Sequence, residues 1–430
     1  GNYPGVAAGA GVVTLTHNVT LNVSPANPVG ALVLQANLTP NASRTLTVTG
    51  NCSVSSGTLN LSNAVGRIVT LNVGGNFTMS GGTITESSTS YGSVVFNGSG
   101  TQVFTKTGGT ISNIINFTVN SGSNLNMGTS VLNGSSGTFI LSAGATLTTA
   151  NVAGISSAGA TGSIQVTGTR TYSTGANYVY NGTLGQITGT GLPATVNNLT
   201  INNISGVTMT GGITLAAGGT LTLSSGILQA GANSVILTNT NPVTSVVWTP
   251  GSFVNVTSGV MERTLASGLA GSGNNYLFPI GEGGVFKGLT LLDVNTGATG
   301  PVLRATVSPT GALTGDGTTI ASVGQRYWTL TNLNSGNLTS ARVELYESDL
   351  DFLKTIGMSS AVSGNYSSIG GSISGSSLIS STVLNPGPYF SIGALVRTYY
   401  SYQTGDWNSP STWTSDPSGT LPFGSTAPGD

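Results

Sequence analysis

Charged side chains are scarce in this chain of 430 residues, where they make up 5% of the total and leave a formal net charge of −1. An ordinary soluble domain has roughly 25%. So few cations cannot form a nucleic-acid-binding patch or a polybasic membrane surface, so the sequence predicts no nucleic-acid partner. No apolar run reaches the ~18 residues of a membrane-spanning helix, so no such segment is predicted. A net charge near zero favours association over dispersion, which predicts self-association.

Catalytic acids and bases are rarest in the first 240 residues. This part has no Asp and a single carboxylate, Glu86, and His17 is the only histidine of the whole chain. Glycoside hydrolysis normally needs two carboxylates, and polysaccharide lyases need a base and usually a metal held by acidic ligands. Repeat-type calcium binding needs an Asp in successive turns. The sequence therefore predicts no catalytic residues and no enzymatic activity, and we interpret His17 as a surface or cap residue.

Cysteine occurs once, at Cys52, which excludes an internal disulfide framework. We interpret it as a small buried hydrophobe in a strand, with an intermolecular bridge as the alternative. Helix signals are essentially absent. The chain is nevertheless not a disordered tract, because 38% of it is hydrophobic and disorder needs low hydrophobicity with high charge.

The first half contains a short strand pattern at nearly fixed spacing. Copies begin at Thr45, Thr58, Thr70 and Thr83, which are 13, 12 and 13 residues apart. Each copy alternates apolar residues with Thr or Asn and is followed by Gly, Ser or Asn, as half-buried strands between tight turns do. The strand candidates of this type are Thr45–Val48, Thr58–Leu61, Thr70–Val73, Thr83–Thr85, Thr146–Thr148, Asn198–Ile201 and Thr220–Leu223.

Short, regularly spaced strands fit either a sandwich or a solenoid. Outward Thr and Asn favour the solenoid, because each residue of a stacked coil lies about 4.8 Å from an equivalent one. Like charges would repel at that distance, whereas Thr and Asn can form hydrogen-bonded ladders. The sequence thus predicts a right-handed parallel β-helix over residues 1–240, with two or three strand–turn units in each turn.

Composition changes near Asn241. Of the 23 charged residues, 5 precede this point and 18 follow it, and all four tryptophans follow it. Alternating segments such as Val302–Val307 and Ala341–Tyr346 continue, with loops of ordinary length between them. This pattern predicts an antiparallel β-sandwich over residues 241–398.

One acidic cluster stands out in this second region, formed by Glu347, Asp349 and Asp351. Oxygen ligands at alternate positions suit Ca²⁺, but the companion Gly and the distal Glu of a loop site are missing. We therefore interpret the cluster as a solvated loop or strand edge, with a weak Ca²⁺ site as the alternative. Arg326, beside Tyr327 and Trp328, is expected to pack and to make a cation–π contact.

Four motifs of the second region resemble a module of large secreted surface proteins of Bacteroidota, adhesins exported by the type IX route. The motifs are Gly259–Leu265, Tyr276–Gly281, Arg326–Trp328 and Leu345–Asp349. In those proteins the module commonly follows a solenoid rich in Gly, Asn and Thr. The resemblance implies an extracellular, cell-surface location and a structural or adhesive role, and it transfers no catalytic residue.

Residues 399–430 are predicted to be a linker and cap that leads to a following unit. They contain Gly405-x-Trp407-x-x-Pro410-x-x-Trp413 and close with Pro428-Gly429-Asp430. In the same secreted proteins such a segment resembles the start of the next solenoid. We therefore expect Trp407, Pro410 and Trp413 to form an inter-unit cap between tandem copies joined end to end, since an uncovered solenoid end recruits other strands.

These observations lead to one expected function and two alternatives. We expect a non-enzymatic structural or adhesive protein, a subunit or repeat of a cell-surface fibre or giant adhesin, with surface glycans as possible partners. The first alternative is a carbohydrate-binding accessory module of a secreted polysaccharide-degrading enzyme, with aromatic side chains of the second region as the sugar-binding surface. The second, a degenerate polysaccharide lyase, is opposed by the carboxylate count. No resident cofactor is expected apart from the weak Ca²⁺ site.

Overall fold

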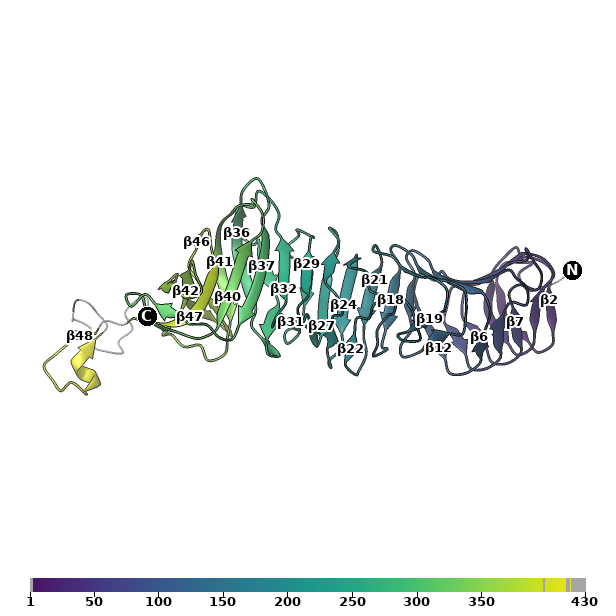
Figure 1. Ribbon diagram of the computed structural model, residues 1–430, viewed down its shortest axis with the longest axis horizontal. Coiled ribbons are helices and arrows are strands. Elements are labelled where there is room, and N and C mark those ends of the chain that lie inside the picture. Colours follow the sequence, from purple (N-terminus) through teal and green to yellow (C-terminus); the bar gives the residue numbers. More distant parts are fainter. Residues whose placement is uncertain (1–2, 397–398, 415–417, 419–430) are drawn as a thin grey trace.

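The structure is a computed structural model that describes residues 3–396, 399–414 and 418. These residues are all-β apart from one short 3-10 helix, η1 (Pro410–Thr412). Figure 1 shows a long stack of strands that starts near the N-terminus and passes into a second region of strands. The stack is a parallel β-solenoid of about 12 turns, and the mixed and antiparallel region after it fits a β-sandwich. The predicted all-β class, with a parallel solenoid before a sandwich, is confirmed.

The solenoid strands of successive turns stack into sheets. The largest sheet has 17 strands. They are β1 (Ala10–Leu15), β3 (Val29–Leu34), β5 (Arg44–Val48), β6 (Cys52–Val54), β8 (Val69–Val73), β9 (Phe77–Met79), β11 (Gly92–Phe96), β12 (Thr101–Lys106), β14 (Ile115–Val119), β15 (Asn124–Asn126), β17 (Phe139–Leu141), β18 (Thr146–Thr149), β20 (Arg170–Tyr172), β21 (Asn177–Tyr180), β24 (Asn198–Asn202), β27 (Leu221–Ser225) and β30 (Val246–Trp248).

Smaller sheets close the other sides of the coil. One contains β2 (Val19–Leu21), β4 (Leu38–Pro40), β7 (Thr58–Asn60), β10 (Thr83–Thr85) and β13 (Thr110–Ile111), and a pair is formed by β16 (Leu132–Asn133) and β19 (Ile164–Gln165). Another contains β22 (Gln186–Ile187), β25 (Val207–Thr208), β28 (Ile227–Gln229), β31 (Phe253–Asn255), β34 (Ile280–Glu282) and β35 (Val285–Phe286).

Two sheets make up the sandwich region, and the first also holds solenoid strands. The first contains β23 (Thr195–Val196), β26 (Ile213–Leu215), β29 (Ser234–Leu237), β32 (Val260–Thr264), β37 (Val302–Ser308), β40 (Tyr327–Asn332), β47 (Tyr389–Leu395), β42 (Lys354–Ser359), β43 (Asn365–Ser368), β38 (Thr314–Gly315) and β39 (Ile320–Val323). The second contains β33 (Tyr276–Phe278), β36 (Leu289–Thr296), β41 (Leu338–Tyr346), β45 (Ser377–Ile379), β44 (Ser372–Ser374) and β46 (Val383–Leu384), and the tail has the pair β48 (Tyr400–Ser401) and β49 (Trp413–Thr414).

The strand copies recognised in the sequence stack in the expected register. Thr45 lies opposite Thr70, and Thr58 lies opposite Thr83, so each copy pairs with the second copy after it. The inward positions then form continuous apolar columns, such as Leu46, Leu71 and Val94, all of which are buried. Because every second residue points inward, a register that aligns equivalent copies buries the whole apolar set at once.

Outward amides and hydroxyls bond along the stack, as predicted. Asn72 Nδ2 donates to Thr47 Oγ1 at 3.2 Å, and Asn177 Nδ2 donates to Thr146 Oγ1 at 3.2 Å. Asn amides also accept from the backbone of the next turn, for example Asn76 Oδ1 from the Val103 N–H at 2.8 Å. Each turn is therefore joined to the next by backbone and side-chain hydrogen bonds that run parallel to the long axis.

The solenoid passes into the sandwich without a break in hydrogen bonding. β32 pairs in parallel with β29 and, along its other edge, antiparallel with β37. β30 and β31 also pair in parallel with β27 and β28. Parallel pairing thus continues beyond the boundary expected at residue 240 and reaches β34, which pairs in parallel with β31. The rise in charge near Asn241 and the change of pairing do not coincide, because pairing depends on how the backbone returns and not on the composition of the segment.

Candidate functional site

Glu347 lies directly after β41 and binds two cations. Its Oε1 contacts Lys287 Nζ, and its Oε2 accepts from Arg326 Nη1 at 2.6 Å. The side chain of Lys287 is almost fully buried and that of Glu347 is mostly buried. Burial alone raises the pKa of Glu347, but the hydrogen bond and charge of Lys287, the charge of Arg326 and the hydrogen bond from the Ser348 N–H outweigh it and hold this pKa below its usual value. Glu347 is therefore a carboxylate committed to two protein cations.

The other two members of the acidic cluster point elsewhere. Asp349 and Asp351 are exposed, and Asp349 adopts a positive φ of 60°. Asp351 Oδ1 accepts from the Leu353 N–H at 2.8 Å, which closes a local turn. Within residues 3–396, 399–414 and 418, no three His, Cys, Asp or Glu side chains gather in a way that could hold a metal ion. Asp349 and Asp351 match the interpretation of a solvated loop, whereas Glu347 does not, because it is mostly buried between two cations. The structure does not bring the three candidate Ca²⁺ ligands together.

A cleft of about 340 Å³ lies against this ion-pair cluster. Its walls include Gln325, Arg326, Ser348, Asp349, Leu350 and Lys354. Arg326 was expected to make a cation–π contact with its aromatic neighbours, and instead it forms the ion pair with Glu347. The described cation–π contacts belong to Arg263, whose Cζ lies 5.0 Å from the ring centre of Tyr276 and 5.8 Å from that of Phe278.

The tryptophans of residues 241–396 do not form an open aromatic platform. Trp328 is fully buried, and its Nε1 donates to the Lys287 carbonyl at 2.8 Å. Trp248 is partly covered and stacks on Phe286, with ring centres 5.1 Å apart and an interplanar angle of 24°. A sugar-stacking surface built from these two indoles is therefore not present.

The predicted cap residues lie close together in the tail. Trp407 is 84% exposed, its ring meets that of Trp413 edge to face with centres 4.7 Å apart, and Trp413 Nε1 donates to the Trp407 carbonyl at 2.8 Å. Pro410 begins η1. Together with residues 401–405, the two indoles line a shallow hollow of about 520 Å³. The closing Pro428-Gly429-Asp430 lies outside the described residues.

The first turn of the solenoid presents a partly open edge. The described pairings give β1 one neighbour, β3. Val12 on β1 is 68% exposed, and Val19 on β2 is exposed as well. Apolar side chains beside unpaired strand groups are the features that a cap would cover. Figure 1 shows these strands at the end of the stack that lies farthest from the tail.

Glu86, His17 and Cys52 carry acid–base or thiol chemistry in the solenoid, and their surroundings indicate structural roles. Glu86 is buried, and its Oε2 accepts from the Ser88 N–H at 2.6 Å. His17 is exposed in the bend between β1 and β2, with Nδ1 3.1 Å from Thr16 Oγ1. Cys52 is fully buried on β6, and burial raises the pKa of its thiol to about 12. The interpretation of Cys52 as a buried hydrophobe is confirmed, and its burial argues against an intermolecular bridge.

Two buried glutamines were missed in the sequence. Gln102 Oε1 accepts from the Gly98 N–H at 2.9 Å, and its Nε2 donates to the Val73 and Gly75 carbonyls at 2.7 and 2.8 Å. Gln186 bonds in the same way to the Gly182 N–H and to two carbonyls of the preceding turn. The shared pattern Asn-Gly-x-x-x-Gln, at residues 97–102 and 181–186, is the signal that could have found them.

Comparison of the chain with protein-family models, curated proteins and solved structures gave no match. Within the described residues there is also no helix with the length and apolarity needed to cross a membrane. The resemblance to secreted surface adhesins thus remains a prediction from the four sequence motifs.

Proposed function

We propose that this chain is an extracellular, non-enzymatic unit of a cell-surface fibre or giant adhesin, in which the solenoid serves as a stiff spacer. The observation that carries the proposal is the ladder of uncharged side chains that joins successive turns. About 12 turns at a rise of about 4.8 Å give a rod roughly 55 Å long. Bending such a rod stretches several axial hydrogen bonds at once, so the stack resists bending.

The junction between the two regions supports the same role. β32 belongs to both, because one edge continues the solenoid and the other starts the antiparallel sheet. A pulling force along the long axis would therefore pass through backbone hydrogen bonds. A flexible linker at this point would let the spacer and the sandwich move separately. The continuous sheet favours instead a single unit that carries the force.

The proposed partner along the fibre is another copy of the same unit. The exposed indole of Trp407, packed on Trp413, offers an apolar surface. The exposed Val12 and the unpaired edge of β1 form the surface of the first turn that the tail would cover. We propose that the tail of one copy covers the first turn of the next.

Electron microscopy of the native material and sedimentation of the 430-residue chain together test this function. We expect fibres in the native material, and concentration-dependent association of the chain that W407A weakens. L184A is the matched control, because Leu184 is also exposed but lies in the solenoid. Dispersed particles in the native material would refute the fibre role, while unchanged association of W407A would refute the cap alone.

A second candidate function is a carbohydrate-binding accessory module of a secreted polysaccharide-degrading enzyme. The buried Trp328 and the covered Trp248 speak against an aromatic platform. The observation in favour is the polar cleft beside Glu347. Binding of glycans in that cleft is compatible with either a fibre or an accessory module, and imaging of the native material separates the two.

A further inference from the structure

The cleft beside Glu347 contains cationic groups that the described structure leaves partly unpaired. Arg326 uses Nη1 to bind Glu347, and its Nε is buried without a hydrogen-bond partner. Its Nη2 and the Lys354 ammonium have no bond to any residue of the described part of the chain. Both side chains line the cleft. Arg326 Nη2 and the Lys354 ammonium can therefore donate hydrogen bonds to a ligand in the cleft.

The charges around the cleft favour an anion. The cleft itself is lined by two cations, Arg326 and Lys354, and by two carboxylates, Glu347 and Asp349, so its lining is neutral. Lys287 lies outside the lining and binds Glu347, and with it the group carries a net charge of +1 (3 − 2). Lys287 and Arg326 share the same carboxylate, so the positive charge of this group is only partly compensated.

We propose that this cleft binds the carboxylate of a hexuronate residue in an acidic polysaccharide. A guanidinium and an ammonium together match a carboxylate, and charge-assisted bonds of this kind are stronger than neutral ones. The Gln325 amide, the Ser348 hydroxyl and the Asp349 carboxylate can bond the ring hydroxyls, while Leu350 offers an apolar wall. A volume of about 340 Å³ falls in the usual range of small-molecule sites.

The Lys287–Glu347 pair positions the recognition group. Glu347 holds Nη1 of Arg326 and in this way orients the guanidinium. Lys287 is buried below it, and its carbonyl accepts from the fully buried Trp328. The Arg326 guanidinium is therefore held by a carboxylate that packing already restrains, which lowers the cost of ordering this one donor on binding. The proposal extends the surface role by naming a ligand class, and it does not depend on the tandem arrangement.

Titration calorimetry of the full chain tests the site with three probes: methyl glucuronide, methyl glucoside and acetate. We expect the glucuronide to bind about tenfold more tightly than either of the others, because only it combines the charge with the hydroxyls. Added salt should weaken its binding. Equal binding of the glucoside, or binding of acetate as tight as that of the glucuronide, would overturn the proposal.

Three variants locate the binding. K354Q should weaken glucuronide binding about fivefold or more, and D349N should tighten it, because it removes a negative charge and Asn tolerates the positive φ at this position. K106Q removes one lysine from the solenoid instead and should bind as the wild type does. Folding of each variant is checked by its melting temperature. Wild-type affinity in a folded K354Q would overturn the assignment, whereas absence of fibres would bear only on the proposed fibre role.

Discussion

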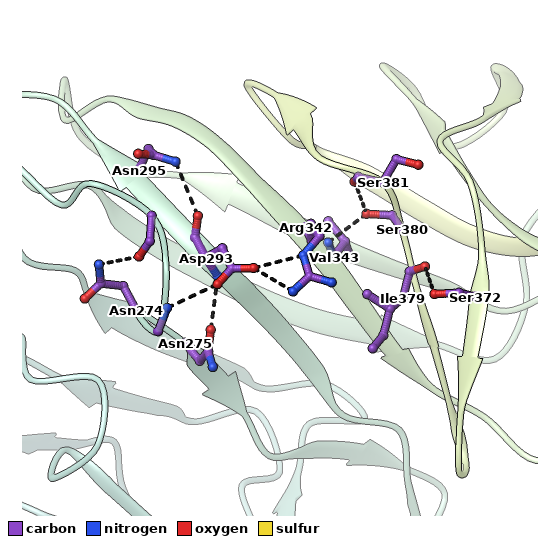
Figure 2. A network of polar contacts seen from close by, with 12 residues as sticks. Asn274, Asn275, Asp293, Asn295, Arg342, Val343, Ser372, Ile379, Ser380 and Ser381 are labelled. Carbon is purple, nitrogen blue, oxygen red and sulfur yellow. Dashed lines mark hydrogen bonds and ion pairs between the residues drawn. The ribbon is translucent and has the colours of Figure 1, made fainter.

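Arg342 on β41 binds a single carboxylate oxygen of Asp293 on β36 through two nitrogens, with Nε at 2.9 Å and Nη2 at 2.6 Å from Oδ2 (Figure 2). Asp293 has a positive φ of 52° and lies where the register between the two strands shifts. Its Oδ1 accepts from the Gly273 N–H at 3.1 Å. The bulge thus turns one carboxylate toward both the neighbouring strand and a loop.

Two substitutions of Asp293 separate the contribution of its charge to stability from the contribution of its tolerance for positive φ. D293N keeps a residue that tolerates positive φ, so we expect it to cost about 0.5–1 kcal/mol of unfolding free energy, as for a partly exposed ion pair. D293A should cost about 1 kcal/mol more, because Ala is strained at this φ. Urea denaturation at pH 7 gives both values, and equal stability of the two variants would contradict the strain argument.

The same residue predicts a pH dependence with a definite sign. The hydrogen bond from Arg342, followed by that from Gly273, lowers the pKa of Asp293 in the folded protein. Its stabilising contribution is therefore present above the unfolded value of about 3.9 and is lost as the pH falls through the folded pKa. The stability difference between wild type and D293N should shrink between pH 5 and pH 2, and a difference that grows with acid would disprove this account.

Charges introduced into an outward column test the ladder argument. Thr146 and Asn177 lie opposite each other on β18 and β21 and are joined by a hydrogen bond. The double variant T146D/N177D should be about 1–3 kcal/mol less stable than the sum of its single variants predicts, because two like charges come within about 5 Å. The variant T146D/N177K places opposite charges at the same two positions, so most of that extra destabilisation should disappear. Additive effects in this double-mutant cycle would show that charge is not what the solenoid avoids.

Gln102 offers a test of a buried amide between turns. Q102E keeps the size of the side chain but replaces the donor to the Val73 and Gly75 carbonyls by an acceptor. We expect a loss of about 2–4 kcal/mol at pH 7. Because burial raises the pKa of the new carboxyl, the loss should be small below about pH 4.3 and should grow as the pH rises. Q35E, at an exposed glutamine, is the control and should be near neutral at both pH values.

Arg263 joins the last parallel turn to the sandwich as a buried cation. Its Nη1 donates to the Leu277 carbonyl, its Nη2 contacts Ser245 Oγ, and burial lowers its pKa to about 10. R263K keeps the charge but loses the planar fork, so we expect it to cost about 3 kcal/mol. R263M removes the buried charge at similar volume and should cost less. Thermal or urea unfolding ranks the two, and a more stable R263K would mean that the positive charge itself is required.

The strand pattern of the solenoid was predictable because it is local. Alternation around Thr45, Thr58, Thr70 and Thr83 indicated which residues point inward, and the observed register aligns those same positions. The end of the parallel region was not predictable in this way. The two adjacent charged residues of β32, Glu262 and Arg263, do not indicate how its edges pair, and only the return of β37 alongside it makes its second edge antiparallel.

The candidate sites also include one feature that is local in sequence and one that is not. The proximity of Trp407 and Trp413 follows from a spacing of six residues. The binding of Glu347 to Lys287 joins residues 60 positions apart, so no local pattern could indicate it. The acidic cluster drew attention to Asp349 and Asp351, yet the partners of Glu347 are Lys287 and Arg326, which lie in the loops before β36 and β40.

The sequence by itself determined that this chain forms stacked half-buried strands with uncharged outer faces, because a period of two leaves one apolar side to bury and its neighbours are Thr and Asn. It also determined that the first 240 residues have no pair of carboxylates, because Glu86 is the single carboxylate among them. Only the tertiary structure decided which cation meets which carboxylate, where Arg263 is buried and where a cleft opens. Those outcomes depend on the order in which distant strands lie side by side, and short-range alternation carries no information about that order.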